Sequence, residues 1–182
     1  EHFGYDTFRG NQQDIIKRTL EGYDSLVIMP TGAGKSICYQ LPALILKGTV
    51  IVVSPLIALM QDQVAALTTA GIAAAALHSN QNDVTTKEIL NDFKDGALQL
   101  LYVSPEKAVG KYFQEQIDLQ KISLIAIDEA HCVSVWGNDF RPEYTELVHL
   151  INKSNVPHIA LTATADKATR QDIAQKLGLK SA

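Results

Sequence analysis

Short runs of apolar residues alternate with longer segments of helical periodicity along the whole chain. Most of the apolar runs are continuous, whereas a strand with one face in water would alternate apolar and polar residues. Continuous runs of this length are typical of strands that are buried on both faces of a sheet. The segments predicted as strands are Ser25–Met29, Val50–Val53, Ala73–Leu77, Gln99–Val103, Ser123–Ile127 and Pro157–Leu161.

Helices are predicted between these strands. The clearest case is Leu56–Ala70, which carries an apolar stripe at helical spacing and is followed by Gly71. The stripe consists of Leu56, Leu59, Met60, Val64 and Leu67. The other predicted helices are Gln12–Leu20, Lys35–Leu46, Val84–Phe93, Glu143–Leu150 and Lys167–Leu177. Alternating strands and helices predict one α/β lobe over residues 1–182, with parallel strands, right-handed crossovers and helices on both faces. Ligands bind such sheets beyond the carboxyl ends of the strands.

The composition is that of a soluble globular domain, because 46% of the 182 residues are apolar and 20% are charged. No run is long enough to span a membrane, and the start has no signal-peptide pattern. The chain begins at Glu1, so we expect an excised or processed fragment. Two cysteines, Cys38 and Cys132, exclude a disulfide framework and favour a reducing cytosol. With a net charge of −4, any nucleic-acid site would be a local patch.

The segment Met29–Ser36 (Met-Pro-Thr-Gly-Ala-Gly-Lys-Ser) lies between a predicted strand and a predicted helix. A glycine-containing turn in this position can point backbone N–H groups at an anion, as in a phosphate-binding loop. Lys35 would then reach the β- and γ-phosphates, and the Ser36 hydroxyl would hold Mg²⁺. The strict pattern has glycine in place of Met29, and such a turn can be purely structural. The residues expected around the phosphates are Thr31, Gly32, Ala33, Gly34, Lys35 and Ser36.

An acidic pair, Asp128-Glu129, follows the predicted strand Ser123–Ile127. Asp128 can bind Mg²⁺, mostly through water. Glu129 would then orient or deprotonate the attacking water. Two acids after a strand can also simply stabilise a helix N-terminus. The coincidence of this pair with Met29–Ser36 favours a nucleotide-hydrolysing site.

With Ala130 and His131 the acidic pair reads Asp-Glu-Ala-His, and the chain resembles the first RecA-like lobe of a RecQ-family DNA helicase of superfamily two. The resemblance covers essentially the whole chain. It implies a RecA-like P-loop NTPase lobe, with a mostly parallel central sheet and helices on both faces. In this superfamily the loop often lacks its first glycine, so Met29 fits. The catalytic residues implied are Lys35, Asp128, Glu129 and His131.

Residues 3–12 resemble the N-terminal adenine motif of the family. Tyr5 offers a ring and Arg9 a guanidinium plane for stacking, and Gln12 can hydrogen-bond the adenine edge. The commonest family form has proline after the arginine, where this chain has Gly10-Asn11. The residues proposed to bind the base are nevertheless intact.

Two Ser-Pro pairs resemble further helicase motifs, Ser54-Pro55 and Ser104-Pro105. Each stands at the end of a predicted strand, where hydroxyl and N–H groups suit phosphate contacts along single-stranded DNA. The alternative is that each pair merely starts a helix.

The segment after His131 resembles the aromatic-rich loop that RecQ helicases carry beyond the acidic motif. Trp136 and Phe140 can stack on unpaired bases, at about 1–3 kcal/mol per contact, and Arg141 can pair with a phosphate or stack. Because this loop continues directly from Glu129, DNA bound there could reposition the catalytic acid.

The segment Ala160–Ala165 resembles helicase motif III, with Thr-Ala-Thr in place of the commoner Ser-Ala-Thr. The hydroxyls of Thr162 and Thr164 could bond to His131 and link nucleotide state to lobe movement. A threonine cap on the helix Lys167–Leu177 is the structural alternative.

The resemblance implies a 3'-5' type helicase that couples ATP hydrolysis to translocation on single-stranded DNA and to unwinding. ATP and Mg²⁺ would be the cofactors, and DNA and a second RecA-like lobe the partners, in a bacterial cytoplasm or a nucleus, the cytoplasm being favoured. The second lobe with its arginine finger, the zinc-binding region and the winged helix are absent from residues 1–182, so this chain should bind Mg-ATP but hydrolyse it slowly. An RNA helicase or related translocase, and a non-hydrolysing nucleotide switch, remain alternatives.

Overall fold

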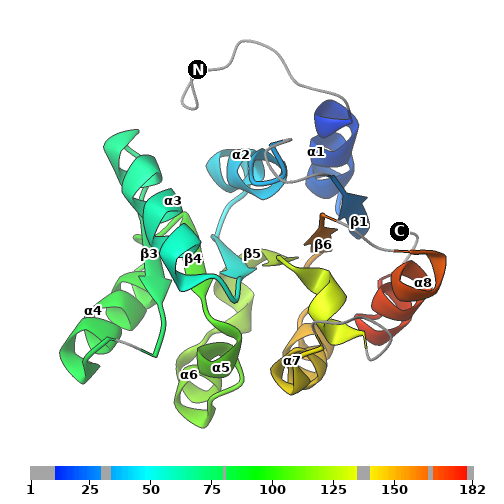
Figure 1. The fold of residues 1–182 in the computed structure, drawn as a ribbon. Coiled ribbons are helices and arrows are strands. Elements are labelled where there is room, and N and C mark those ends of the chain that lie inside the picture. The colour runs from blue at the N-terminus through cyan, green and yellow to red at the C-terminus, as the bar shows by residue number, and fades with distance from the viewer. Residues whose placement is uncertain (1–10, 30–33, 80, 135–139, 164–165, 180–182) are drawn as a thin grey trace.

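The computed structural model describes residues 11–29, 34–79, 81–134, 140–163 and 166–179. Within these residues six strands form one sheet in the order β1-β6-β5-β2-β4-β3, and every neighbouring pair is parallel (Figure 1). The strands are β1 (Ser25–Ile28), β2 (Thr49–Val53), β3 (Ala74–Leu77), β4 (Leu100–Val103), β5 (Ile122–Ile127) and β6 (His158–Thr162).

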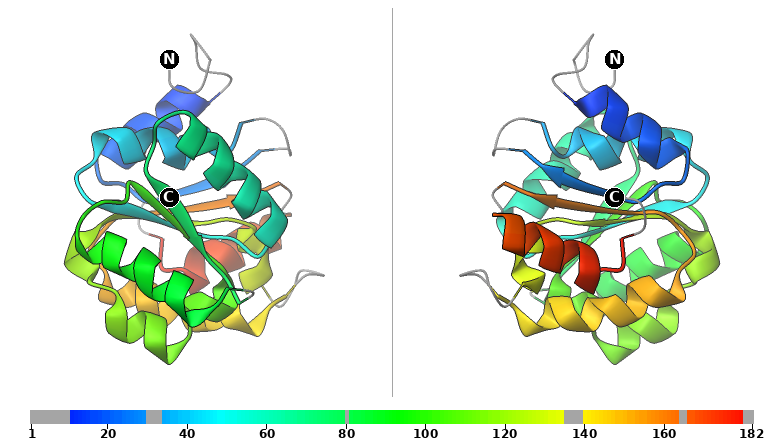
Figure 2. Two further views of the ribbon diagram at one scale, coloured as in Figure 1. Left: turned by 90° about the vertical axis from the view of Figure 1, so that its left-hand side faces the viewer. Right: turned by 90° about the vertical axis from the view of Figure 1, so that its right-hand side faces the viewer.

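The helices cover both faces of this sheet (Figure 2). One face is covered by α1 (Gln12–Leu20), α2 (Ile37–Ile45) and α3 (Ile57–Thr69). The other face is covered by α4 (Asp83–Lys94), α5 (Pro105–Ala108), α6 (Lys111–Gln116), α7 (Pro142–Lys153) and α8 (Lys167–Lys176). Two 3₁₀ turns, η1 (Leu119–Lys121) and η2 (Ala130–Val133), flank β5. No helix in the described ranges is long and apolar enough to cross a membrane.

The side chains of successive residues in the central strand β2 point into the hydrophobic cores on opposite faces of the sheet. Val50 and Val52 pack with α2 and α3, whereas Ile51 and Val53 pack with the helices on the other face. All four are fully buried, and burying one such side chain contributes about 1.5–3 kcal/mol. A strand that serves two cores needs apolar residues at every position, which explains the continuous runs in the sequence.

The predicted strands and long helices are all confirmed, with ends that shift by a few residues. The short elements α5, α6, η1 and η2 were not predicted, because so few residues show no periodicity. The apolar stripe of α3 is only partly buried: Met60 and Leu67 lie in the core, but Leu56 and Leu59 are 43% and 42% exposed.

Backbone hydrogen bonds hold the residues just beyond the strands at the carboxyl edge of the sheet. The N–H of Asp128 donates to the carbonyl of Val53 at 2.9 Å, and the N–H of Ser54 donates to the carbonyl of Val103 at 3.1 Å. Two further bonds of this kind run from Ser104 to Leu77 at 3.0 Å and from Met29 to Thr162 at 3.1 Å. The sheet's pairing therefore continues one residue past the strands, and it fixes the positions from which the candidate site is built.

Both cysteines are expected to be unreactive in the folded chain. Cys38 is fully buried and Cys132 is 3% exposed, and burial raises the pKa of the Cys38 thiol to about 11. Because the thiolate is the reactive form, neither cysteine should be alkylated at pH 8 until a denaturant unfolds the chain. Mass spectrometry after a short iodoacetamide pulse would measure this. Rapid labelling of either cysteine in the native chain would contradict this burial.

Candidate active site

Gly34 lies in a left-handed conformation, with φ of +81°, and it is held by a side chain from α1. The Nε2 atom of Gln12 donates to the carbonyl oxygen of Gly34 at 3.0 Å, and Gln12 is only 5% exposed. Gln12, to which the sequence analysis assigns the adenine edge, therefore contacts the segment Met29–Ser36 through Gly34. Thr31, Gly32 and Ala33 lie outside the described residues, as do Tyr5 and Arg9.

Lys35 and Ser36 stand at the N-terminus of α2, as the sequence predicts. The carbonyl of Ser36 accepts hydrogen bonds from the N–H groups of Tyr39 and Gln40, at 3.2 and 2.9 Å. The Ser36 side chain makes no capping bond to the helix. The positive end of the α2 dipole lies here, so this point of the chain favours a bound anion.

Asp128 stands at the end of β5 and is buried, with 8% of its surface exposed. Burial raises the pKa of its carboxyl above the ordinary value, while the nearby ammonium of Lys35 acts in the opposite direction. Asp128 Oδ1 also accepts from the N–H of Glu129 at 2.9 Å. The structure thus brings Lys35 and Asp128 together, and a cation bound here would favour the ionised carboxylate.

Glu129 has a left-handed backbone, with φ of 53° and ψ of 44°, and it alone among the described non-glycine residues has a positive φ. This conformation costs about 1–2 kcal/mol for a residue with a β-carbon. It is held by the hydrogen bond to Asp128 Oδ1 and by the bond from the N–H of Cys132 to the Glu129 carbonyl, at 3.0 Å. Strained backbone of this kind is concentrated at functional sites.

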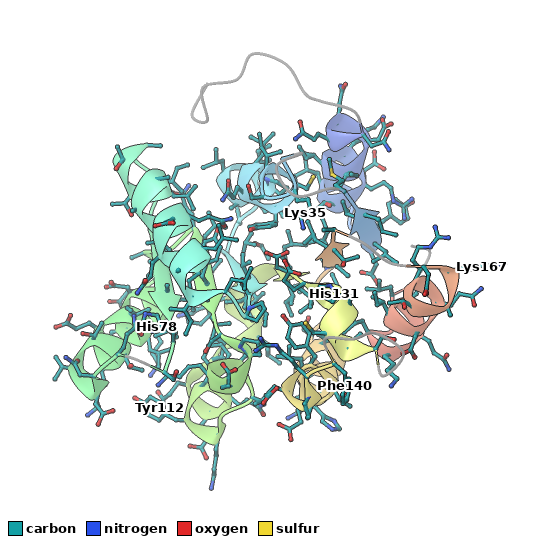
Figure 3. The ribbon with its side chains drawn as sticks, viewed as in Figure 1. Lys35, His78, Tyr112, His131, Phe140 and Lys167 are labelled. Atoms are coloured by element: carbon teal, nitrogen blue, oxygen red, sulfur yellow. The ribbon has the colours of Figure 1, made fainter. Side chains whose placement is uncertain are left out.

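His131 links the ends of β5 and β6. Its Nδ1 atom lies 2.8 Å from Thr162 Oγ1 and 3.6 Å from Glu129 Oε2. The predicted contact between Thr162 and His131 is therefore confirmed. In Figure 3, Lys35 lies beside α2 and His131 beside η2. Thr164 lies outside the described residues, and the cap of α8 is the Asp166 side chain, which accepts from the Thr169 N–H at 2.8 Å, so a threonine cap is wrong.

Ser54 and Ser104 are both buried, and each hydroxyl bonds to nearby backbone. Ser54 Oγ accepts from the N–H of Leu56, and Ser104 Oγ accepts from the N–H of Lys107, both at 3.4 Å. Ser104 caps α5, which Pro105 begins, so the structural alternative holds for this pair. DNA contacts by these two serines stay a prediction.

Phe140 and Arg141 lie exposed just before α7. Phe140 is 38% exposed, and the Arg141 side chain, 44% exposed, reaches to 3.9 Å from Glu106 Oε1 on α5. Figure 3 shows Phe140 beside α7, away from Lys35. Trp136 lies outside the described residues, so its proposed contact with DNA stays a prediction.

Tyr144 is the residue that sequence reasoning missed. Its hydroxyl donates to the backbone carbonyl of Asp128 at 2.8 Å, and its ring is fully buried in the first turn of α7. The sequence offers one indication of this role: position 144 is a tyrosine, although a phenylalanine would fill the same space without a hydroxyl.

In the described part of the chain, no group of three or more His, Cys, Asp or Glu side chains could hold a metal ion by itself. One carboxylate and one hydroxyl, from Asp128 and Ser36, match the few protein ligands that Mg²⁺ takes when phosphates and water supply the rest.

Comparison with known proteins identifies the family. Residues 9–173 match the family model described as DEAD/DEAH box helicase. The chain belongs to the DEAD/DEAH box helicase family.

Within the DEAD/DEAH box family, the chain is similar to proteins named RecQ. It is 54% identical over 182 residues to the ATP-dependent DNA helicase RecQ of Pasteurella multocida, covering 98% of this chain and 28% of that protein. It is 45% identical over 182 residues to the RecQ protein of Bacillus subtilis, covering 98% of this chain and 31% of that protein. The chain thus spans about a third or less of the length of these relatives.

Solved structures confirm the fold class. The Hef helicase domain of Pyrococcus furiosus superposes with a TM-score of 0.73 at 20% identity, covering 94% of this chain and 36% of that chain. The helicase MrfA superposes with a TM-score of 0.77 at 18% identity, covering 97% of this chain and 30% of that chain. The predicted RecA-like lobe with a parallel sheet and helices on both faces is therefore correct.

Gly34→Ala and Gly71→Ala form a matched pair that tests the contact between Gln12 and Gly34. The two glycines have nearly equal φ, +81° and +84°, so alanine should strain both by about 1–2 kcal/mol. An added Cβ meets nothing within 4 Å at Gly71, but it would lie 2.2 Å from Gln12 Nε2 at Gly34. Both variants should lose thermal stability, and Gly34→Ala should lose more, because it also disturbs the hydrogen bond of the buried Gln12.

Only Gly34→Ala should displace Gln12, and it should weaken ATP binding about tenfold or more, which corresponds to 1.4 kcal/mol. Thermal unfolding and a fluorescence titration with Mg-ATP would measure the two effects. Equal ATP affinity in the two variants would argue against any role of this contact in nucleotide binding.

Proposed function

We propose that this chain is the ATP-binding lobe of a RecQ-type DNA helicase, and that residues 1–182 form its N-terminal RecA-like domain. The observation that carries the proposal is the buried Asp128 carboxyl, which lies near the Lys35 ammonium and adjoins the strained Glu129. A purely structural acidic pair would need neither the burial nor the left-handed backbone. The similarity to proteins named ATP-dependent DNA helicase RecQ supports the same conclusion.

The residues divide the work of ATP hydrolysis between them. Lys35 binds the β- and γ-phosphates, together with the backbone of residues 31–34. Glu129 orients the attacking water and accepts its proton. The hydrogen bond between His131 and Thr162 transmits the change between the ATP-bound and hydrolysed states. Adenine is held by Tyr5, Arg9 and Gln12. Lys35, Glu129 and His131 all stand at the carboxyl edge of the sheet, beyond β1 and β5.

Mg²⁺ would be held by Ser36 and, partly through water, by Asp128. The raised pKa of the Asp128 carboxyl supports this assignment, because a buried carboxylate without enough positive charge nearby is the kind of group that a divalent cation stabilises. When bound, the ion would neutralise charge on the phosphates as the terminal phosphoryl group is transferred.

DNA would bind at the same edge of the sheet and at the loop that precedes α7. Trp136 and Phe140 would stack on unpaired bases, and Arg141 would bind phosphate, with Ser54, Ser104 and Thr164 contacting the strand further along. A protein that acts on chromosomal DNA would work in the bacterial cytoplasm or in a nucleus. Translocation in the 3'-5' direction and unwinding would require the second lobe.

The first test separates nucleotide binding from hydrolysis. The isolated chain should bind Mg-ATP, and Lys35→Ala should abolish that binding. It should hydrolyse ATP far more slowly than the full-length protein, because an arginine finger from a second lobe is worth about 10³–10⁵ in turnover. In the full-length protein, Glu129→Gln should retain ATP binding and lose turnover. Binding without turnover in the unmodified full-length protein would instead favour a nucleotide switch.

The second test concerns the loop before α7. In the full-length protein, single-stranded DNA should stimulate ATP hydrolysis more than RNA of the same sequence does. Trp136→Ala should leave the rate without DNA unchanged and remove most of the stimulation, because it deletes a stacking contact worth about 1–3 kcal/mol. A steady-state ATPase assay with each nucleic acid would measure this. Stronger stimulation by RNA would favour an RNA helicase, and unchanged stimulation of Trp136→Ala would refute the proposed role of the loop.

A further inference from the structure

The Tyr144 hydroxyl bonds to the peptide group that determines how Glu129 is presented. Its acceptor, the carbonyl oxygen of Asp128, belongs to the peptide bond between Asp128 and Glu129 and lies 2.8 Å away. The orientation of that peptide plane sets the φ of Glu129, which is 53°. A donor on this oxygen therefore resists rotation of the plane toward the ordinary negative φ. A rotation about the Cα–C bond of Asp128 that takes this oxygen away from Tyr144 would also carry the Glu129 Cα and its side chain away from their present positions.

Space filling alone does not require a hydroxyl at this position. The Tyr144 ring is fully buried and packs in the same apolar core as Val133, Leu147 and Ile151. Phenylalanine would satisfy that core, whereas a buried hydroxyl is unfavourable unless it is hydrogen-bonded. Burial raises the pKa of Tyr144 far above its ordinary value, so the hydroxyl remains a donor at every physiological pH.

Tyr144 also bonds to Arg141, the last residue of the loop to which DNA contacts are assigned. The N–H of Arg141 donates to the carbonyl of Cys132 at 2.8 Å, which joins the two ends of the segment between them. The N–H of Tyr144 then donates to the carbonyl of Arg141 at 3.0 Å. A displacement of Arg141 would thus reach Tyr144 through one backbone hydrogen bond, and Asp128 through the tyrosine hydroxyl.

We infer that Tyr144 is a positioning residue for ATP hydrolysis. Its hydroxyl holds the Asp128–Glu129 peptide in the orientation that directs the Glu129 carboxylate at the attacking water, and it transmits movement of the loop to that peptide. This inference rests on the proposed function. It adds a residue that touches neither nucleotide nor DNA, and it gives the coupling between loop and catalytic acid a specific hydrogen bond.

The test is Tyr144→Phe in the full-length protein, which removes the hydroxyl and keeps the ring. The matched control is Tyr102→Phe. Tyr102 is also a buried tyrosine, 1% exposed, and its hydroxyl bonds to side chains of α2, accepting from Gln40 Nε2 at 2.9 Å, rather than to the Asp128–Glu129 peptide. Both variants lose one buried hydroxyl, so a general loss of stability should affect them alike.

We expect Tyr144→Phe to lower the kcat of DNA-stimulated ATP hydrolysis about ten- to a hundredfold, as misplaced catalytic groups typically do. The KM for ATP and the Kd for single-stranded DNA should stay unchanged, and Tyr102→Phe should keep the kcat of the unmodified protein. Rates are expressed per molecule that binds Mg-ATP in a titration, so an unfolded fraction lowers the number of sites and not kcat.

The outcomes separate the inference from the function on which it rests. If the unmodified full-length protein shows no DNA-stimulated ATP hydrolysis, the proposed function is wrong. If it is active and Tyr144→Phe keeps its kcat, the inference is overturned while the function stands. An equal fall in kcat in Tyr102→Phe, or a rise in KM without a fall in kcat, would also overturn the inference.

Discussion

The burial of the Asp128 carboxyl is the constraint around which the candidate site is arranged. A carboxylate taken out of water is destabilised unless charge or hydrogen bonds replace its hydration. Here the replacements come from separate parts of the chain: the Lys35 ammonium from the loop after β1, the N–H of Glu129 and the His131 imidazole. The peptide plane between Asp128 and Glu129 points that N–H at the carboxylate, and the backbone turns left-handed at the next Cα, that of Glu129. The strained backbone of Glu129 and the proximity of Lys35 are thus both tied to one buried charge.

The order of the strands makes this convergence possible. Because β6 lies between β1 and β5, the loop that carries Lys35, the Thr162 hydroxyl and the acidic turn stand beyond three adjacent strands. On the other side, β2 and β4 carry Ser54 and Ser104 along the same edge. The proposed nucleotide site and the proposed DNA contacts therefore lie next to each other at one edge of the same sheet. The ion pair between Arg141 and Glu106, at 3.9 Å across exposed side chains, adds little to stability.

Much of the fold could be predicted from the sequence, because strands buried on two faces are apolar throughout and the crossing helices are periodic. The pairing of Lys35 with Asp128 could be predicted too, since both belong to motifs with known partners. The αL backbone of Glu129, the bond from Gln12 to Gly34 and the role of Tyr144 could not. Each depends on which atoms meet in three dimensions, and a residue type alone does not reveal that. The exposure of Leu56 and Leu59 was missed for a related reason, because periodicity gives a stripe but not the depth to which it is covered.

The hydrogen bonds just beyond the strands also bear on how the sheet avoids misalignment. A half-buried strand cannot slip by one residue without turning its apolar side chains into water. This safeguard is weak in β2, where a slip would exchange one set of apolar residues for another, since all five of its residues are buried. The polar residues at the strand ends determine the register of β2 instead. The backbone bonds of Asp128, Ser54 and Ser104 would form in any register, but a slip would draw one of these polar side chains in between the apolar strands, where an unpaired polar group is costly. The edge proposed to bind nucleotide and DNA thus also keeps the strands in register, so an insertion within β2 would damage folding and function together.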